Sequence, residues 1–470
     1  MKRIHMMIGI PGSGKTTFVN KFVKKNNYKV VSTDIVRLNN KGIDEKEVWP
    51  TVYKMIGDIL KKEDDVIFDA TSITKKVRDR FKENVNNFIE SYELIGYFFP
   101  THYSVCEKRI DARNKKENEL FLPLEVVESY GKAVYPPMYE EGFSEVKLMS
   151  NVPDLLEGMV EDGYQGYALY FKEGNDILEE YSGFAKIGTD EPIRNDTNFR
   201  LASVTKQFIA YAILVLVNEN KLKLEDVLFN IFDDMPEYTK TITIRNLLNH
   251  TSGIYDYEDM EHTDEQVQDE DILDFIKGTN GQYFETGFKY QYSNTAYVLL
   301  GLIIEKKSGI KLGNFLKEKV FDKFNMTNSQ LNYEPITEIT PRAYGHLREN
   351  GKLVMKDQYW CSATCGDGGI YSSINDLKKW LKNIKNLEKE FEIMEETHIV
   401  NGNDIEYGMG IRIKNINGHR LVYHCGSTIG TNTIIGFIDD LDIEFIFLTN
   451  NGNKDTEVFL SNIRKRIGNK

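Results

Sequence analysis

The sequence predicts an α/β protein of two domains that meet near residue 150, and three observations carry this prediction. Short apolar runs alternate with amphipathic stretches over the first 150 residues, as buried parallel strands alternate with helices. Residues 1–150 hold 25 Lys and Arg against 22 Asp and Glu, whereas the remaining 320 hold 34 against 50. Such asymmetry favours domains with different partners. A turn-forming cluster at 150–154 separates them. We therefore expect domains at 1–150 and 155–470.

Composition excludes several classes of protein. With 41% hydrophobic residues, 26 Tyr and 26 Phe, the 470-residue chain can bury a core, so a disordered or collagen-like chain is excluded. No apolar run reaches about 18 residues, and the apolar start has no small-residue cleavage site, so we expect neither a membrane span nor a signal peptide. Four cysteines are too few for a disulfide scaffold, which favours a reducing cytoplasm. The pair Cys361 and Cys365 lacks companion ligands and is expected to serve packing.

A glycine-rich loop lies between the first predicted strand and the first predicted helix. Ile4–Ile8 is a buried strand by its apolar run, and Thr17–Lys25 is amphipathic at helical spacing. Gly9–Thr16 between them fits G-x-x-x-x-G-K-[ST], in which backbone N–H groups and a helix N-terminus surround phosphate oxygens. This context predicts an ATP site in which Thr16 binds Mg²⁺. The expected nucleotide-binding residues are Gly9, Gly12, Ser13, Gly14, Lys15, Thr16 and Thr17.

Acidic residues follow the next two predicted strands. Asp34 comes just after Lys29–Ser32, where a carboxylate can accept the proton of an attacking hydroxyl. Arg37 could then orient the acceptor or its phosphate. The third apolar run ends at Asp69, which could hold a Mg²⁺-bound water or order the loop. The alternative for Asp34 and Arg37 is a solvated turn with a surface arginine.

A fourth strand is predicted at Leu94–Phe99, and a basic amphipathic helix follows at Cys106–Lys116. Arg109 and Arg113 on this helix could close over a transferring phosphoryl group as a lid. A basic helical face is also commonly just solvated, so both interpretations stay open.

Together, residues 1–150 resemble the polynucleotide-kinase-like branch of P-loop kinases, which have an AAA-type, zeta-like fold. The resemblance rests on the loop, on Ser32, Asp34 and Arg37, on the strand end at Asp69, and on the turn Tyr139–Phe143. It implies phosphoryl transfer from ATP to a hydroxyl of nucleic acid or of a small molecule, and it leaves the acceptor open. The family pattern has Asn where this chain has Ala70, which questions any role of that side chain.

A nucleophile pattern opens the second part. Ser203 and Lys206 lie at positions i and i+3 before an apolar helix at Gln207–Val217, so their side chains would be neighbours. A desolvated lysine beside a serine can lower the barrier to proton transfer from the hydroxyl. The motif alone is weak, and a solvated pair is its ordinary interpretation.

Two later elements strengthen this pattern. Tyr292 and Asn294 are two apart in a stretch that we expect to be extended, so they would point to one side. The phenol could shuttle a proton and the amide could hold a substrate carbonyl. His424 ends a strand-like run and would face the cleft, and Gly426 lets backbone approach closely. The Ser427 N–H could then form an oxyanion hole with that of Ser203.

These segments resemble the serine β-lactamase and penicillin-binding protein superfamily, most closely its class C and esterase branch, over about 155–460. The three motifs occur in the expected order, and supporting segments are Leu247–Gly253, Gly366–Ser373 and Leu448–Asn451. The resemblance implies an antiparallel sheet flanked by helices plus a helical subdomain. It also implies an acyl-enzyme mechanism with Ser203 as nucleophile and Lys206 and Tyr292 as coupled bases, and which base acts first stays open.

Two departures shape the expected substrate. His424 stands where the family has lysine, so the cationic anchor for a carboxylate is weakened. Exported relatives carry signal peptides, so we expect a small ester, amide or D-peptide as substrate and not an antibiotic. We expect the acidic stretch Asp256–Asp274 to be a solvated loop and helix near the cleft. The sequence thus predicts a bifunctional cytosolic enzyme, and the alternative is that one half only binds or regulates.

Overall fold

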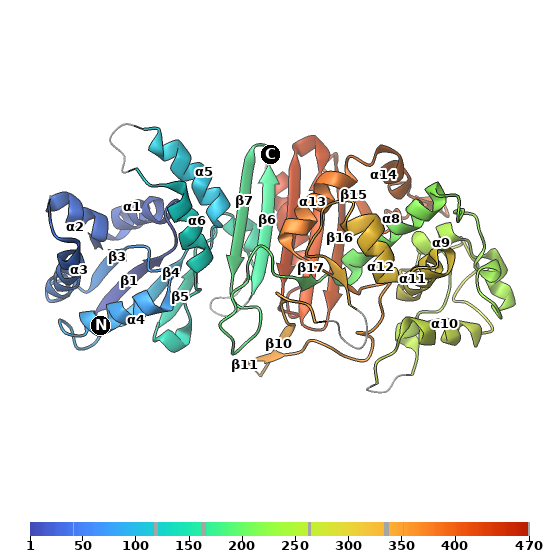
Figure 1. The fold of residues 1–470 in the computed structure, drawn as a ribbon, viewed down its shortest axis with the longest axis horizontal. Coiled ribbons are helices and arrows are strands. Elements are labelled where there is room, and N and C mark those ends of the chain that lie inside the picture. Colours follow the sequence, from blue (N-terminus) through green and yellow to red (C-terminus); the bar gives the residue numbers. More distant parts are fainter. Residues whose placement is uncertain are drawn as a thin grey trace. The chain divides into compact units, whose positions relative to one another are not determined.

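The computed structural model describes residues 1–40, 42–116, 121–160, 166–261, 265–332, 338–350 and 352–468. They form two compact units, which are described separately below (Figure 1). The first contains Met1–Gly166 with two short later segments, Ile177–Phe184 and Asp190–Pro192. The second contains most of the remaining chain, from Tyr167 onward.

The first unit is built on a five-stranded sheet with the order β2-β3-β1-β4-β5, and every recorded pair is parallel. The strands are β1 (Arg3–Ile8), β2 (Lys29–Ser32), β3 (Asp65–Asp69), β4 (Glu93–Phe98) and β5 (Glu145–Leu148). Four were predicted to within a residue at each end. The fifth was missed because its Glu-Val-Lys-Leu sequence has no apolar run, as suits an edge strand with one neighbour.

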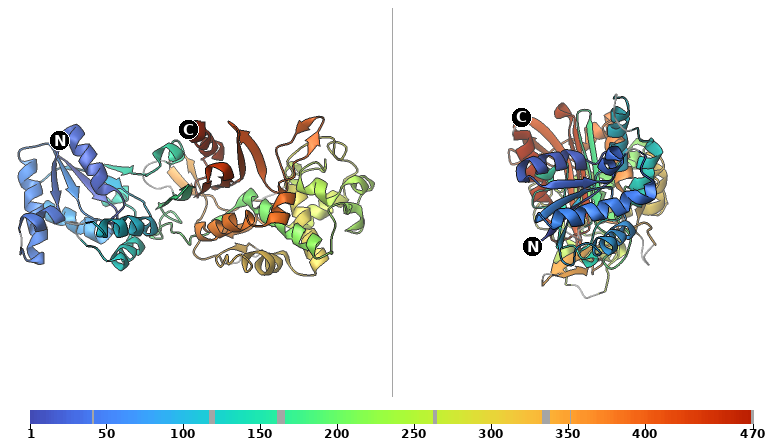
Figure 2. Two further views of the ribbon diagram at one scale, coloured as in Figure 1. Left: turned by 90° about the horizontal axis from the view of Figure 1, so that it is seen from above. Right: turned by 90° about the vertical axis from the view of Figure 1, so that its left-hand side faces the viewer.

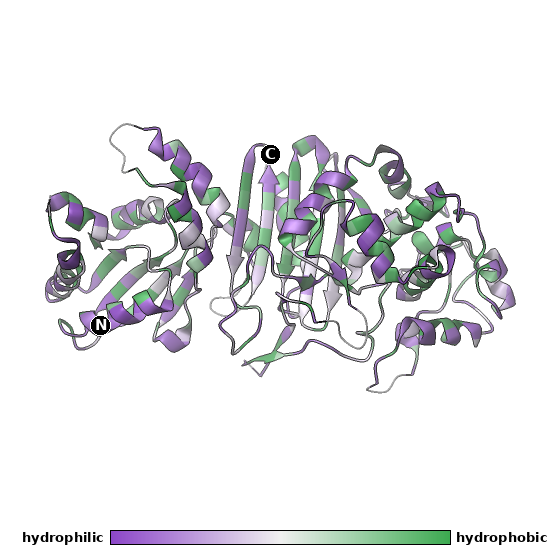
Figure 3. Cartoon of the chain, in the orientation of Figure 1, coloured by the Kyte–Doolittle hydropathy of each residue, from purple (hydrophilic) through white to green (hydrophobic). Residues whose placement is uncertain are grey.

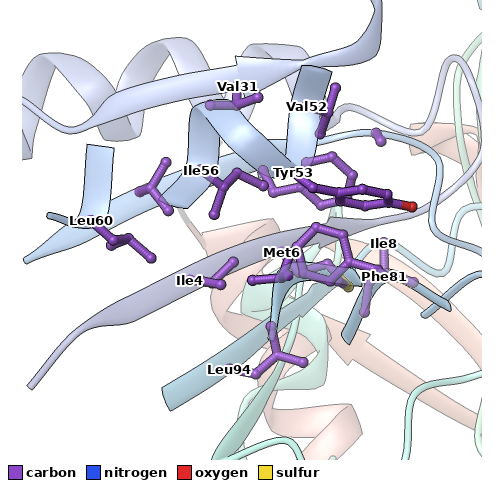
Figure 4. Close-up of a cluster of buried hydrophobic side chains, with 14 of the residues drawn as sticks. Ile4, Met6, Ile8, Val31, Val52, Tyr53, Ile56, Leu60, Phe81 and Leu94 are labelled. Atoms are coloured by element: carbon purple, nitrogen blue, oxygen red, sulfur yellow. The ribbon is translucent and has the colours of Figure 1, made fainter. Parts of the chain in front are cut away.

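Helices cover this sheet and complete its core. They are α1 (Lys15–Asn26), α2 (Thr33–Asn39), α3 (Glu45–Leu60), α4 (Lys75–Val85), α5 (Tyr103–Asn114), α6 (Leu124–Ala133) and α7 (Pro153–Leu156). Alternate residues of the central strand, such as Ile4 and Met6, pack with Tyr53 and Ile56 of α3 and with Phe81 of α4 (Figure 4). Burial of these side chains removes apolar surface from water, which is the main stabilising contribution.

A fully buried ion pair connects helix α4 of the first unit to a later turn of the same unit. Arg78 of α4 donates from Nε and Nη2 to the two carboxylate oxygens of Glu141, each at 2.7 Å. Glu141 belongs to the 3₁₀ turn Tyr139–Glu141 and also accepts from the backbone N–H of Met138. Both side chains are completely buried. The turn from the kinase-like pattern thus has a structural role here.

The other large sheet has six strands in the order β15-β16-β17-β18-β6-β7, and its recorded pairs are antiparallel. The strands are β6 (Tyr167–Glu173), β7 (Asp176–Ser182), β15 (Arg412–Ile416), β16 (His419–Thr428), β17 (Thr431–Ile438) and β18 (Ile443–Thr449). Strand β15 pairs with β16 only as far as Tyr423, so the stretch His424–Thr428 has β17 as its only recorded neighbour.

Helices lie on both faces of this sheet (Figure 2). Phe459 of α15 (Thr456–Gly468) contacts the rings of Phe445 and Phe447 on β18. Glu444, which alternates with them and so points to the opposite face, accepts a hydrogen bond from Lys385, just after α13 (Ile374–Ile384). The strands β17 and β18 are buried along almost their whole length, and the hydropathy colouring shows hydrophobic stretches in this sheet (Figure 3). The predicted α/β class, a parallel-sheet unit followed by an antiparallel-sheet unit, is confirmed.

Further helices of the second unit form its helical part. They are α8 (Thr205–Asn218), α9 (Ile244–Leu248), α10 (Asp269–Lys277), α11 (Asn294–Ser308), α12 (Leu312–Leu316) and α14 (Glu388–Met394). Short strands complete the unit, namely β8 (Phe199–Arg200), β9 (Gln330–Leu331), β10 (His346–Glu349), β11 (Lys352–Met355), β12 (Ile370–Ser372), β13 (Ile399–Val400) and β14 (Asn403–Asp404). Among the described residues, no helix is both long and apolar enough to cross a membrane.

Candidate active sites

The glycine-rich loop of the first unit has the shape of an anion cradle. Gly12 and Gly14 adopt φ of +85° and +107°, a region that side chains rarely occupy. A Cβ on Gly12 would also lie 2.9 Å from the carbonyl oxygen of Cys106. The buried Ser13 hydroxyl has no hydrogen-bond partner among the described residues. A free donor in a loop that only glycine permits fits the phosphates of a nucleotide.

Lys15 lies inside this loop at the start of α1. Its ammonium donates to the carbonyl oxygens of Gly9 and Ile10 at 2.7 and 2.9 Å. Burial lowers the pKa of Lys15 to about 8, and the charge of Asp69 opposes this shift. Burial in turn raises the pKa of Asp69, which ends β3 as predicted. Thr16, an exposed residue of α1, and Asp69 have the oxygen donors that Mg²⁺ prefers.

Asp34 and Arg37 both lie in α2, which Ser32 caps by accepting from the Asp34 N–H. Arg37 donates to Asp34 at 2.9 Å and forms a second ion pair with Glu45. The exposed Asp34 carboxylate is available at the carboxyl end of β2. The guanidinium of Arg37 forms ion pairs with Asp34 and Glu45 and is partly exposed, and its expected role in orienting the acceptor or its phosphate stays a prediction.

The predicted lid arginines lie on α5, which begins three residues earlier than expected. Arg109 donates to the carbonyl oxygen of Gly12 at 3.0 Å and to Asn151 at 3.4 Å. It is therefore attached to the glycine-rich loop. Arg113 follows one helical turn later, which places both residues on one face of the helix.

In the second unit, Ser203 lies in the short 3₁₀ helix η2 (Ala202–Val204), directly before α8. The nucleophile thus precedes the apolar helix, as expected, whereas Lys206 belongs to that helix, which begins two residues earlier than predicted. Ala202 has φ of +47°, an unfavourable conformation for a residue with a side chain and common at functional sites. The preceding Leu201 carbonyl accepts from the Thr433 hydroxyl of β17 at 2.8 Å, which ties this segment to the sheet.

Lys206 is fully buried and uses its ammonium to join three segments. It donates to Ser203 Oγ at 3.1 Å, to Asn294 Oδ1 at 2.8 Å and to the carbonyl oxygen of Asp367 at 2.8 Å. Burial lowers the pKa of Lys206 to about 8, although the nearby charge of Asp367 opposes the shift. A pKa of about 8 leaves a minor fraction of the amine uncharged at neutral pH, so Lys206 can accept a proton there.

Tyr292 and Asn294 reach this cluster from a strand-like segment and a helix start. The predicted extended stretch ends at Ser293, which caps α11, and Asn294 is the first residue of that helix. The Tyr292 ring lies 5.0 Å from the Lys206 ammonium. Burial raises the pKa of the Tyr292 phenol above its usual range, while the Ser203 hydroxyl acts in the opposite direction.

Asn294 is already engaged in the structure. Its Oδ1 accepts from Lys206, and its Nδ2 donates to Glu258 at 2.9 Å. Because the Nδ2 amide group has two N–H donors, the second can donate to a substrate carbonyl while the first stays bonded to Glu258. The Asn294 side chain thus holds Lys206 in place through Oδ1 and also offers an N–H donor to the active site.

The third motif lies on β16 beyond the point where β15 ends. His424 is buried, and its ring nitrogens contact the Tyr407 hydroxyl at 3.0 Å and the Cys425 carbonyl at 2.7 Å. Burial lowers its pKa well below the usual value, so His424 is a neutral, buried group, and its ring centroid lies 6.3 Å from that of Tyr292. A Cβ on Gly426 would lie 2.0 Å from the Leu201 carbonyl. Glycine there allows β16 to pass beside the Ser203 segment, and Ser427 follows at an exposed position.

Sequence reasoning missed two groups at this site. Asp256 lies in the stretch that we expected to be solvated, yet it accepts from the Asn294 N–H at 2.6 Å and burial raises its pKa. Arg412, at the start of β15, lies 5.4 Å from the Tyr292 ring and 5.6 Å from the Tyr407 ring. No carboxylate pairs with Arg412 among the described residues. The sequence gives no sign that Asp256 bonds to Asn294. Arg412 lies 12 positions before His424, and such a spacing is too common to indicate a role at the site.

The cysteines form no metal site. Cys361 and Cys365 are buried and free. In the described ranges, no three His, Cys, Asp or Glu side chains are grouped as metal ligands.

The fold of the second unit and the arrangement of Ser203, Lys206 and Tyr292 are typical of a known protein family. The beta-lactamase family model matches residues 152–468, and an AAA domain model matches residues 4–137. The chain therefore belongs to the beta-lactamase family and carries an AAA domain before it. The predicted fusion of these two kinds of domain is confirmed.

Individual relatives match part of the chain. Penicillin-binding protein 4* of Bacillus subtilis is 31% identical over 310 residues, which cover 61% of this chain and 68% of that protein. A D-aminopeptidase of Brucella anthropi is 27% identical over 282 residues, and the chain spans about half of its length, 52%. An octameric penicillin-binding protein homologue from Pyrococcus abyssi has a TM-score of 0.56 at 27% identity, covering 67% of this chain and 76% of that one.

Proposed function

We propose that the second unit is a serine hydrolase that cleaves a small ester, amide or D-peptide through an acyl-enzyme. The observation that carries this proposal is the buried Lys206 ammonium, which is hydrogen-bonded to Ser203 Oγ and to Asn294 Oδ1. A serine beside a lysine of lowered pKa is an activated nucleophile. The match to the beta-lactamase family supports it.

The reaction follows from these groups. Ser203 Oγ attacks the substrate carbonyl carbon while its proton passes to Lys206 or Tyr292. The negative oxygen is stabilised by the N–H groups of Ser203 and Ser427. The bond to the leaving group breaks, and the departing amine or alcohol takes the proton. Water then attacks the Ser203 ester, which releases the acid and regenerates the hydroxyl.

The pKa values favour Lys206 as the group that accepts the first proton. Burial brings its pKa to about 8, whereas burial moves the phenol of Tyr292 further from neutrality. At neutral pH a useful fraction of Lys206 is uncharged, while Tyr292 stays protonated and can donate to the leaving group.

Arg412 supplies the cation that His424 does not. Its guanidinium stacks against Tyr292 without a carboxylate partner among the described residues, and an arginine fork fits a carboxylate. We therefore propose substrates that carry a free carboxylate, and the D-aminopeptidase and penicillin-binding protein names of the relatives make short D-peptides the first candidates.

Labelling with a fluorophosphonate probe tests the hydrolase proposal. The full chain should be labelled, Ser203→Ala should not be, and Ser461→Ala on α15 should be labelled like the unmodified protein. Equal labelling of Ser203→Ala would refute the assignment. Release of D-alanine from D-alanyl-D-alanine, compared with its L,L isomer, would then test the substrate class.

For the first unit we propose ATP- and Mg²⁺-dependent phosphoryl transfer to a hydroxyl. The glycine-rich loop with its unpartnered Ser13 hydroxyl carries the proposal, and the AAA domain match supports nucleotide binding. Lys15 and Arg109 would contact the phosphates, and Thr16 and Asp69 would hold the metal ion. Asp34 at the end of β2 would accept the proton of the attacking hydroxyl.

ATP consumption tests this second activity. Lys15→Ala should abolish acceptor-dependent consumption of ATP, with Lys25→Ala at the exposed end of α1 as the matched control. The acceptor screen should include an oligonucleotide with a 5′-hydroxyl and a set of small alcohols. Unchanged turnover in Lys15→Ala would refute the kinase proposal.

A cross-test addresses the alternative that one half only regulates the other. Ser203→Ala should retain ATP consumption, and Lys15→Ala should retain labelling of Ser203, if the two activities are independent. Loss of both activities in either variant would favour a regulatory module.

A further inference from the structure

His250 lies in the segment Leu247–Gly253, to which the mechanism above gives no task. It is completely buried and adopts φ of +59°, in the left-handed region. A histidine held in this conformation is uncommon and requires support from its surroundings. The contacts that hold His250 in this conformation also connect it to the active site.

His250 accepts one hydrogen bond from each of the two residues that flank Tyr292. The backbone carbonyl of His250 accepts from the Gln291 N–H at 3.0 Å, and its Nδ1 accepts from the Ser293 N–H at 3.1 Å. The residue between these two donors is Tyr292, and the next residue is Asn294. The ring of His250 also packs on Tyr292 with centroids 4.3 Å apart.

We propose that His250 is the positioning residue for both Tyr292 and Asn294, and that it acts through the Nδ1 acceptor. This inference rests on the proposed hydrolase function. Because Ser293 caps α11, its N–H also fixes where the helix begins and hence where Asn294 meets Lys206. Small displacements of such groups cost about 10²-fold in rate.

The bonding pattern defines the state of the ring. An Nδ1 that accepts leaves the hydrogen of a neutral imidazole on Nε2, which has no partner among the described residues. Burial lowers the pKa of His250 well below its ordinary value. Four tyrosine rings surround it, and the charged or titratable groups that act on it are Lys206, His424 and Arg412. Protonation would remove the acceptor and place a further cation beside Lys206.

Two amide substitutions separate the roles of the two ring nitrogens. Asn has its oxygen where His has Nδ1 and tolerates positive φ, whereas Gln places its amide near Nε2. With D-alanyl-D-alanine as substrate, His250→Asn should keep kcat within about 3-fold, while His250→Gln and His250→Leu should lose about 10- to 100-fold in kcat with KM little changed. Equal losses in Asn and Gln, or no loss in Leu, would overturn the proposal.

Two further measurements keep the result decisive. In a Tyr292→Phe background, His250→Leu should cost much less than it does alone, because both changes affect one group; full additivity would contradict the inference. In the unmodified protein, ¹⁵N-histidine spectra, assigned with His250→Asn, should show Nδ1 unprotonated and Nε2 protonated between about pH 6 and 9. The opposite tautomer would contradict it even if the variants do not fold. Absence of fluorophosphonate labelling in the unmodified protein would instead refute the hydrolase function itself.

Discussion

Lys206 and Asn294 are 88 residues apart in the chain and are joined by a 2.8 Å hydrogen bond from Nζ to Oδ1. This bond connects the start of α8 with the start of α11. The same ammonium reaches Ser203, so the nucleophile, the base and the amide form one unit. Removing any one of these three side chains therefore alters the surroundings of the other two.

Replacing Lys206 by Met keeps the length of the side chain and removes the charge and all three hydrogen bonds. We expect the rate of Ser203 labelling to fall by about 10²- to 10⁴-fold, the range for loss of a general acid–base group. The carbonyl oxygen of Asp367 would also lose its donor, so thermal unfolding should be recorded beside the labelling rate. A rate within 10-fold of the unmodified protein would contradict the role of Lys206.

The rate of acylation should depend on pH through Lys206. The pKa of about 8 means that the neutral, proton-accepting amine becomes more abundant as pH rises. The rate should increase by about tenfold per pH unit below 8 and level off above it. Burial raises the phenol pKa of Tyr292 above its usual range, so a profile that still rises beyond pH 10 would identify Tyr292 as the first base instead.

Gly426→Ala should disrupt the active site from the sheet side. The added Cβ would lie 2.0 Å from the Leu201 carbonyl and 2.5 Å from the Thr433 hydroxyl, so the Ser203 segment must move. We expect labelling to fall by more than about 10²-fold. Gly278→Ala is the matched control, since its nearest neighbour would lie at an ordinary 3.4 Å. Similar losses in both variants would show a general intolerance and not this contact.

Arg412→Gln should weaken binding of substrates that have a free carboxylate. KM for a D-dipeptide should rise by about 10-fold or more, whereas KM for the corresponding C-terminal amide should change little, because only the first loses an ion pair. Equal changes for both substrates would exclude Arg412 as the carboxylate anchor.

Glu141→Gln should destabilise the first unit. Leaving the buried Arg78 guanidinium without its countercharge costs about 3–5 kcal/mol. Urea unfolding followed by circular dichroism should show a lower midpoint for the transition of this unit. Glu140→Gln, on the preceding residue, is the control, and an equal shift in that variant would contradict the assignment.

Much of this architecture could be predicted from local sequence. The strands β1 to β4 are apolar runs, and the loop at Gly9–Thr16 has a spacing that few other structures require. In the same way Ser203 and Lys206 are close because they are three residues apart. Edge strand β5 lacks an apolar run and was therefore missed.

Long-range contacts could not be predicted in this way. Asp256 and Arg412 lie in segments whose local patterns assign them no catalytic role, and His250 lies in a segment that supported the family resemblance without giving this residue a role. Only the fold brings the three residues to Tyr292 and Asn294. The hydrogen bond between His424 and Tyr407 and the ion pair between Arg37 and Glu45 are likewise contacts that local sequence patterns do not reveal. The roles expected for His424 and Arg37 in catalysis stay predictions.

The ion pair of Arg78 and Glu141 also has a consequence for synthesis of the chain. The two residues are 63 positions apart, and Arg78 emerges from the ribosome well before its partner. A nascent chain that lacks Glu141 would have to bury an unpaired guanidinium, which is costly. We therefore expect the N-terminal unit to reach its final packing only after the turn at Tyr139–Glu141 has been synthesised, and a chain that ends before that turn to be incompletely packed.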